Sequence, residues 1–103
     1  MVTKIHNNDL QEAKGSKVAV VDFSAQWCGP CNMLAPIMEE LSEELEGKAA
    51  VFGVDVDENP ALAQEYRIMN IPAVAILKDG QLVDMSVGFK PKAAMQEWIE
   101  KYL

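Results

Sequence analysis

The sequence predicts an α/β protein whose mixed central sheet of about five strands is flanked by four helices. Segments typical of strands and helices alternate through the first part of the chain, and a strand pair with a tight turn follows them. Two β-α-β units give parallel strands and the hairpin adds antiparallel pairing, so we expect a mixed sheet with helices on both faces. Because the chain has 103 residues, half of them hydrophobic, we expect a single domain over residues 1–103.

The first half of the chain predicts two strands and two helices. Residues 2–6 form a short possible strand, and residues 8–14 form a weak helix. Residues 17–25 are β-branched and almost continuously apolar, which is typical of a strand buried on both faces. A helix is expected over residues 31–45, because its apolar residues fall on one face and Gly47 is a common signal for a helix end.

The next strand and helix follow directly. Residues 50–57 have the composition of a strand. Asn59 is placed to cap the following helix, because asparagine is favoured at that position and Pro60 suits the first helical residue. Leu62 and Tyr66 would give this helix an inward face.

A hairpin and a helix complete the predicted fold. Residues 73–77 predict a strand, and Asp79 and Gly80 give a strong signal for a tight turn into a second strand at residues 81–87. Residues 92–103 have their apolar residues at helical spacing, so we expect an amphipathic helix there.

Composition and charge exclude several classes of function. Sixteen acidic and nine basic residues give a net charge of −7, and no run of lysine or arginine occurs, so we expect no nucleic-acid binding. The apolar runs, such as residues 73–77, are far shorter than the ~20 residues that span a bilayer, so we expect no membrane insertion. Residues 1–9 contain no apolar segment typical of a signal peptide, and we therefore expect a cytoplasmic protein.

The two cysteines, Cys28 and Cys31, form a single Cys-x-x-Cys pair between a buried strand and a helix. No distant cysteine exists for a structural disulfide, so the pair is redox-active, metal-binding or simply packed as small hydrophobic residues. A four-ligand zinc site is disfavoured because His6 is the lone histidine. Free amides at a helix start favour negative charge, so we expect Cys28 to be an exposed thiolate and Cys31 a shielded thiol one turn inside.

Asp22 interrupts the apolar strand just before this pair. A buried carboxylate costs several kcal/mol unless it is paired or protonated. Asp22 is therefore either at a strand end in water, or a carboxyl group with a raised pKa that exchanges a proton with Cys31. Pro72 comes just before a predicted strand. The residues alone favour an ordinary trans proline at the start of an edge strand, because most X-Pro peptide bonds are trans.

Residues 27–31 read WCGPC, which resembles the active-site motif of the thioredoxin family. The likeness continues with the strand before it, with Ile71 and Pro72 before a strand, with residues 78–80 at the hairpin and with Gly88. It covers essentially the whole chain. The resemblance implies a thioredoxin fold, and it implies that Pro72 is the family's cis-proline beside the active site.

The resemblance also implies a function: a cytoplasmic protein disulfide reductase and dithiol electron carrier in cell redox homeostasis. Cys28 would attack a substrate disulfide, Cys31 would resolve the mixed disulfide, and Asp22 would carry the proton. No tightly bound cofactor is expected besides the redox-active Cys28–Cys31 disulfide, and no metal. The implied partners are a separate thioredoxin-reductase-like electron donor (a flavoprotein using NADPH or an iron–sulfur enzyme) and disulfide-containing client proteins, with the chain itself a monomer.

A substrate-binding surface is implied around the cysteines. Its residues are Trp27, Gly29, Pro30, Ile71, Pro72, Ala73 and Gly88. The methionines are expected mostly in the core. Two other functions stay open, a binding subunit with incidental cysteines and a disulfide oxidant or isomerase, although oxidants and isomerases of this fold usually carry histidine where this chain has Gly29 and Pro30.

Some positions depart from the family pattern. Gly53 falls where many thioredoxins have a lysine near the buried aspartate, which puts the tuning of Asp22 in question. Asn32, Ser24 and Ala73 replace a common lysine, a usual aromatic residue and a common threonine. None of these changes touches the dithiol, so they bear on redox tuning and on the choice of partner.

Overall fold

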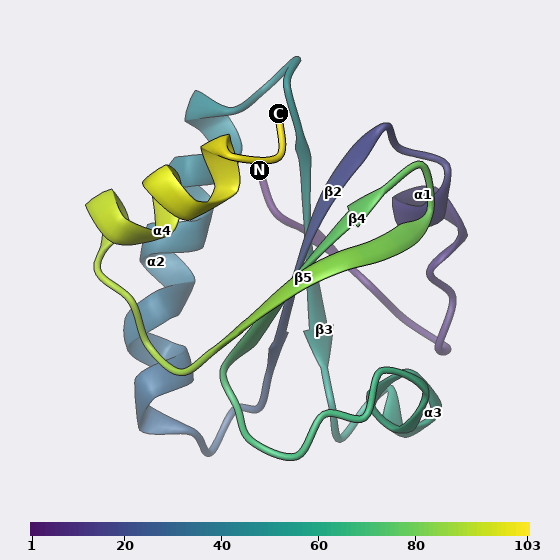
Figure 1. Ribbon diagram of the computed structural model, residues 1–103. Helices are drawn as coiled ribbons and strands as arrows, with labels where there is room; N and C mark the ends of the chain where they lie inside the picture. Colours follow the sequence, from purple (N-terminus) through teal and green to yellow (C-terminus); the bar gives the residue numbers. More distant parts are fainter.

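The computed structural model describes residues 1–103 and contains one sheet of five strands in the order β1-β3-β2-β4-β5 (Figure 1). The strands are β1 (Thr3–Lys4), β2 (Val18–Ser24), β3 (Ala50–Asp55), β4 (Ala73–Lys78) and β5 (Gln81–Val87). The helices are α1 (Gln11–Lys14), α2 (Gly29–Glu44), α3 (Pro60–Glu65) and α4 (Lys92–Glu100). The predicted fold class is confirmed.

The sheet is mixed, as the order of elements predicts. β1, β3 and β2 run parallel, whereas β4 is antiparallel to both β2 and β5. β2 lies in the middle with a partner strand on each side, and all its residues except Ser24 are buried. Its nearly continuous apolar sequence follows from this position, because helices cover it from above and below.

Two helices cover each face of the sheet (Figure 1): α2 and α4 lie on one side, and α1 and α3 on the other. Successive residues of a strand point to opposite faces, so Val18 and Val20 of β2 pack under α2 and α4, while Val21 and Phe23 pack on the other side. Asp22 has the same parity as Val18 and Val20. Its carboxyl group is therefore directed toward α2.

The turn between β4 and β5 has the backbone that the sequence predicts. Asp79 and Gly80 both have positive φ, 51° and 83°, as the favoured two-residue hairpin turns require. A Cβ atom at Gly80 would also lie 3.0 Å from the carbonyl oxygen of Lys14, so the turn packs closely against the end of α1. Glycine is needed at this position for both reasons.

The predicted capping role of Asn59 is wrong, although Asn59 does precede α3. Its side chain is fully buried and donates to the carbonyl oxygens of Ile5 at 3.2 Å and Asp55 at 3.1 Å. Its Oδ1 accepts from the amide of Asn8 at 2.8 Å. The helix amide of Leu62 donates instead to Oδ1 of Asn8, at 3.1 Å. A residue from a distant loop thus provides the cap.

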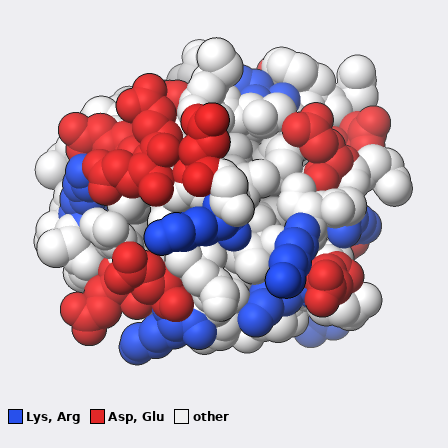
Figure 2. Space-filling model, turned by 90° about the horizontal axis from the view of Figure 1, so that it is seen from above, with Lys and Arg blue, Asp and Glu red and all other residues white.

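Acidic side chains gather at the end of the molecule opposite the start of α2, on the side where α2 lies (Figure 2). Exposed glutamates of α2, including Glu40 and Glu44, form its solvated face. Lys92 of α4 contacts both of them, with Nζ 3.6 Å from Glu40 and closer to Glu44, which links the two helices on this face. None of the helices combines the length and apolar character needed to cross a membrane.

Candidate active site

Cys28 stands at the junction between the loop after β2 and the first turn of α2. The helix begins at Gly29, two residues earlier than predicted, because Pro30 is tolerated in a first turn where its missing N–H is not needed. Cys28 is the N-cap residue, with extended backbone angles, and its Sγ accepts a hydrogen bond from the amide of Cys31 at 3.2 Å. The helix start therefore directs an N–H group at the Cys28 sulfur, which favours negative charge there.

Cys28 and Cys31 form a disulfide, with Cα atoms 5.2 Å apart. The predicted exposure of Cys28 is wrong for this oxidised form, because only 6% of Cys28 and 2% of Cys31 is exposed. Ala25 packs with the pair, and the half-buried side chains of Val56 and Ile71 cover it. In this form the two sulfurs are nearly covered by the side chains packed around them.

The rim on one side is Trp27. Its side chain is 71% exposed, and its Nε1 donates to Oδ2 of Asp57 at 2.8 Å. Gly29 and Pro30 are exposed beside it in sequence. The prediction that methionines fill the core is wrong at Met1, Met33 and Met69, which are 82%, 62% and 91% exposed. Met33 and Met69 belong to the segments that carry Cys31 and Ile71.

The loop before β4 supplies the other side of the site. The Ile71–Pro72 peptide bond is cis, as the family resemblance implies. The carbonyl oxygen of Ile71 lies 3.9 Å from Sγ of Cys28, and the amide and carbonyl groups of Ile71 make no backbone hydrogen bond. Pro72, in contrast, accepts from the amide of Gly88 at 2.7 Å. Ile71 thus offers a free backbone edge next to the reactive sulfur.

Ala73 does not line this surface with its side chain. It is 1% exposed and packs in the core under α1 and α3, and it is paired with Phe23 and Val87 on either side. As the first residue of a strand between two others, it has neither a free edge nor a free face. The prediction that its side chain contributes to the surface is therefore wrong.

Asp22 is buried, with 7% exposed, which rules out the reading of a strand end in water. Its Oδ1 has no hydrogen-bond partner. Burial raises the pKa of this carboxyl group from 3.8 to about 6, and the nearby positive charge of Lys4 opposes part of the rise. Asp22 can therefore gain and lose a proton near neutral pH.

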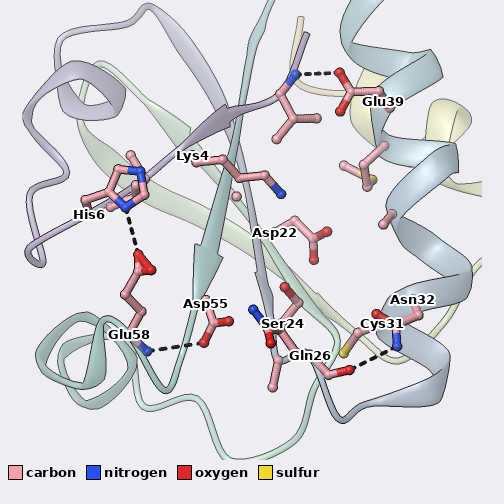
Figure 3. A pocket seen from close by; sticks show the side chains of 16 residues that line it. Lys4, His6, Asp22, Ser24, Gln26, Cys31, Asn32, Glu39, Asp55 and Glu58 are labelled. Carbon is pink, nitrogen blue, oxygen red and sulfur yellow. Dashed lines mark hydrogen bonds and ion pairs between the residues drawn. The ribbon is translucent and has the colours of Figure 1, made fainter.

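A pocket of about 290 Å³ connects Asp22 with Cys31 (Figure 3). Both residues line it, Asp22 from β2 and Cys31 from the first turn of α2. Its volume is large enough for several water molecules at ~30 Å³ each. The Cys31 sulfur and the buried carboxyl group of Asp22 therefore border the same pocket.

The structure adds two residues that sequence reasoning missed. Asp57 holds the indole of Trp27, and Lys4 lines the pocket beside Asp22. The pairing of β1 with β3 brings Lys4 there, and no local pattern in the sequence reveals that pairing. Nδ1 of His6 lies 2.7 Å from Oε2 of Glu58 in an exposed hydrogen bond, and no group of three or more His, Cys, Asp or Glu residues is arranged to hold a metal ion.

Two cysteines that form a disulfide at the start of a helix, beside a free backbone edge, can provide the chemistry of a thiol–disulfide oxidoreductase. That is the class of protein that this fold and site define. The thioredoxin family model matches residues 1–101. The chain belongs to the thioredoxin family and is a protein-disulfide oxidoreductase.

Individual relatives agree with this assignment. Thioredoxin from Staphylococcus aureus is 47% identical over 102 residues, which cover 99% of this chain and 98% of the relative. A solved mutant thioredoxin from Halobacterium salinarum superposes with a TM-score of 0.89 at 37% identity, covering 97% of this chain and 88% of that one. Thioredoxin from Malassezia sympodialis gives a TM-score of 0.89 at 35% identity, with 99% and 90% covered.

Proposed function

We propose that this protein reduces disulfides in client proteins, with Cys28 as the attacking and Cys31 as the resolving cysteine. The observation that carries this assignment is the amide of Cys31, which points at the Cys28 sulfur from the start of α2. The Cys28 thiolate attacks one sulfur of a substrate disulfide. A bond forms between Cys28 and that sulfur, the substrate disulfide breaks, and the other substrate sulfur leaves as a thiolate that takes a proton from water.

Cys31 then completes the reaction. Its thiol gives a proton to the Asp22 carboxylate, and the resulting thiolate attacks Sγ of Cys28. The Cys28–Cys31 bond forms, the mixed disulfide breaks, and the second substrate sulfur leaves. The substrate gains two electrons and the protein becomes the disulfide form. The burial of Asp22 and the pocket that it shares with Cys31 support its role as proton acceptor.

We propose that clients bind in extended form across the cysteine pair. The free backbone edge of Ile71 suits pairing with an extended peptide, and the cis geometry at Pro72 and the partly exposed Gly88 shape the same edge. Trp27, Gly29 and Pro30 would form the opposite rim, with Trp27 as an aromatic anchor. Ala73 is not part of the proposed binding surface, because its side chain is buried in the core.

The finer points of cellular function are proposals as well. A separate reductase would return two electrons to Cys28–Cys31, and the redox group is this disulfide itself, without a tightly bound cofactor. Both cysteines of the chain belong to the site, which supports a reducing, cytoplasmic setting. The single shared sheet supports action as one domain over residues 1–103, and we propose that the chain acts as a monomer.

The reduction of insulin by dithiothreitol tests the proposal. The intact chain should accelerate the reaction, and Cys28→Ser should reduce the rate to the uncatalysed background. Ser42→Ala is a matched control, because Ser42 is also buried on α2 but bonds only to the carbonyl oxygen of Glu39 in its own helix. A Cys28→Ser variant as active as Ser42→Ala would show that the cysteines are incidental.

A further inference from the structure

Three residues from three neighbouring strands lie in one row on the face that α2 covers. Lys4 of β1 is the register partner of Gly53 in β3, and Gly53 is the register partner of Asp22 in β2. The three strands are parallel, so residues in register point to the same face of the sheet. Lys4 and Asp22 therefore flank Gly53, and Figure 3 shows the lysine side chain extending toward Asp22.

Gly53 leaves the path between them open. A Cβ atom at this position would lie 3.7 Å from Cδ and 3.9 Å from Nζ of Lys4, so the lysine side chain passes directly over the glycine. Strands in a sheet are spaced ~4.8 Å apart, and two such steps separate the backbone of Lys4 from that of Asp22. An extended lysine side chain covers most of that distance. A branched side chain at Gly53 would stand in its way.

Lys4 is the only lysine or arginine among the residues that line this pocket. Its other ionisable residues face it from four segments: His6 after β1, Glu39 and Cys31 on α2, Asp55 at the end of β3, and Glu58 in the loop before α3. The acidic groups already have partners.

Glu39, Glu58 and Asp55 each have a hydrogen-bond partner within about 3 Å. Glu39 accepts from the amide of Val2 at 2.9 Å, and Glu58 pairs with His6 at 2.7 Å. Asp55 accepts from the amides of residues 57 and 58 at 2.8 and 3.2 Å. Lys4 makes no ion pair with any of them, and Oδ1 of Asp22 has no partner in the protein. The unpaired cation and the unpaired buried carboxyl group therefore face one another.

We infer that Lys4 is the charge partner of Asp22, that it reaches Asp22 because residue 53 is glycine, and that the pair sets the pH range in which Asp22 accepts a proton. The inference rests on the proposed role of Asp22 in resolution. Lys4 touches neither sulfur, and it acts as a positioning residue through its charge. A positive charge nearby favours the carboxylate, and only the carboxylate can take the proton of Cys31.

The test is the titration of the Asp22 side chain in the oxidised protein, followed by carboxyl-carbon NMR. Lys4→Met should move the Asp22 pKa above its value of about 6, whereas Lys4→Arg should keep it close to wild type. Lys17→Met is the control, because Lys17 is an exposed lysine outside the pocket. Equal pKa values for Asp22 in Lys4→Met and Lys17→Met would overturn the inference.

Gly53→Val tests the path with Lys4 in place. The variant should raise the Asp22 pKa as Lys4→Met does, and the double variant should show no further rise beyond the larger single effect. Fully additive shifts would overturn the part assigned to Gly53. The rate of resolution of a preformed mixed disulfide should move to higher pH together with the titration in Lys4→Met. If Asp22 titrates as expected and the rate does not follow, the charge pair stands and the proposed proton role of Asp22 fails.

Discussion

Asn59 and Asp22 are both buried polar side chains, but they differ in how completely their polar atoms are hydrogen-bonded. Asn59 joins three backbone groups from two separate segments, the loop of Ile5 and Asn8 and the end of β3 at Asp55, through its three hydrogen bonds. Asp22 has an oxygen without any partner and a raised pKa. Most buried polar groups in proteins resemble Asn59, and an exception calls for an explanation. The difference teaches that Asn59 stabilises the fold through its hydrogen bonds, whereas the burial of Asp22 is unfavourable for stability and fits the proton-accepting role proposed for it.

The largest expected effect on stability comes from Asn59→Ala. The change removes three hydrogen bonds of about 1 kcal/mol each and leaves the carbonyl oxygen of Ile5 without a partner, so we expect a loss of about 3–4 kcal/mol. Urea unfolding would measure it. Ser42→Ala, which removes one hydrogen bond within a helix, should cost less than about 1.5 kcal/mol. Equal losses would mean that the Asn59 network adds nothing special to the fold.

Asp22→Asn should have the opposite sign and depend on pH. The folded state holds the Asp22 proton more tightly than the unfolded state, since folding raises its pKa from 3.8 to about 6. The protein therefore loses stability as the pH rises through this window, by at most about 3 kcal/mol, and Asp22→Asn should recover that loss at pH 7.

Unfolding of Asp22→Asn at pH 3 and pH 7 would check this prediction. Near pH 3 Asp22 is protonated in both the folded and the unfolded state, so the stability gained by Asp22→Asn should vanish. Asp9→Asn, at an exposed carboxylate, is the control and should show no such pH-dependent gain. A destabilised Asp22→Asn variant at pH 7 would place Asp22 with Asn59 among the residues that stabilise the fold.

The same substitution should impair the reaction. Asparagine cannot accept the proton of Cys31, so resolution of a preformed mixed disulfide should slow by about 10²-fold, the lower end of the usual effect of a general base. Its dependence on pH around 6 should flatten as well. Stopped-flow kinetics would follow both changes. A normal rate with an unchanged pH profile would remove Asp22 from the mechanism.

Asn8→Gly should give the smallest effect. Asn8 has a positive φ of 54°, which glycine adopts freely, so the change isolates the loss of the cap on the Leu62 amide. We expect a loss of about 1 kcal/mol in urea unfolding, the usual contribution of one hydrogen bond. The amide of residue 8 can still donate to Asn59, so a loss as large as that of Asn59→Ala would contradict the separation of the two roles.

Local patterns in the sequence predict most of the fold. The apolar run of β2, the turn at Asp79 and Gly80, and the amphipathic pattern of α2 are properties of neighbouring residues, and the structure confirms all three. The choice between the two readings of Asp22 needed the structure, because burial depends on what packs over a strand. The family resemblance supplied the cis bond at Pro72, which the residues alone did not predict.

The wrong predictions for Cys28, Ala73 and Asn59 share one cause, since each depends on contacts between distant segments. Cys28 is covered by Ile71, and Ala73 is enclosed by two neighbouring strands. Asn59 bonds to residues near the N-terminus instead of capping its own helix. Lys4, which the sequence analysis missed, lies beside Asp22 in the pocket because β1 pairs with β3 in one particular register. Strand register and loop packing of this kind are not encoded in any short stretch of sequence.

The central claim is that Cys28 attacks and Cys31 resolves, and trapping of mixed disulfides tests it most directly. Cys31→Ser keeps the attacking sulfur and removes the thiol that would release the substrate. Incubated with oxidised client proteins, Cys31→Ser should accumulate disulfide-linked complexes through Cys28. These complexes should appear as bands on a non-reducing gel and disappear when the sample is first treated with dithiothreitol. Cys28→Ser should accumulate none. Complexes with Cys28→Ser instead would reverse the two roles, and their absence from both variants would contradict the reductase mechanism.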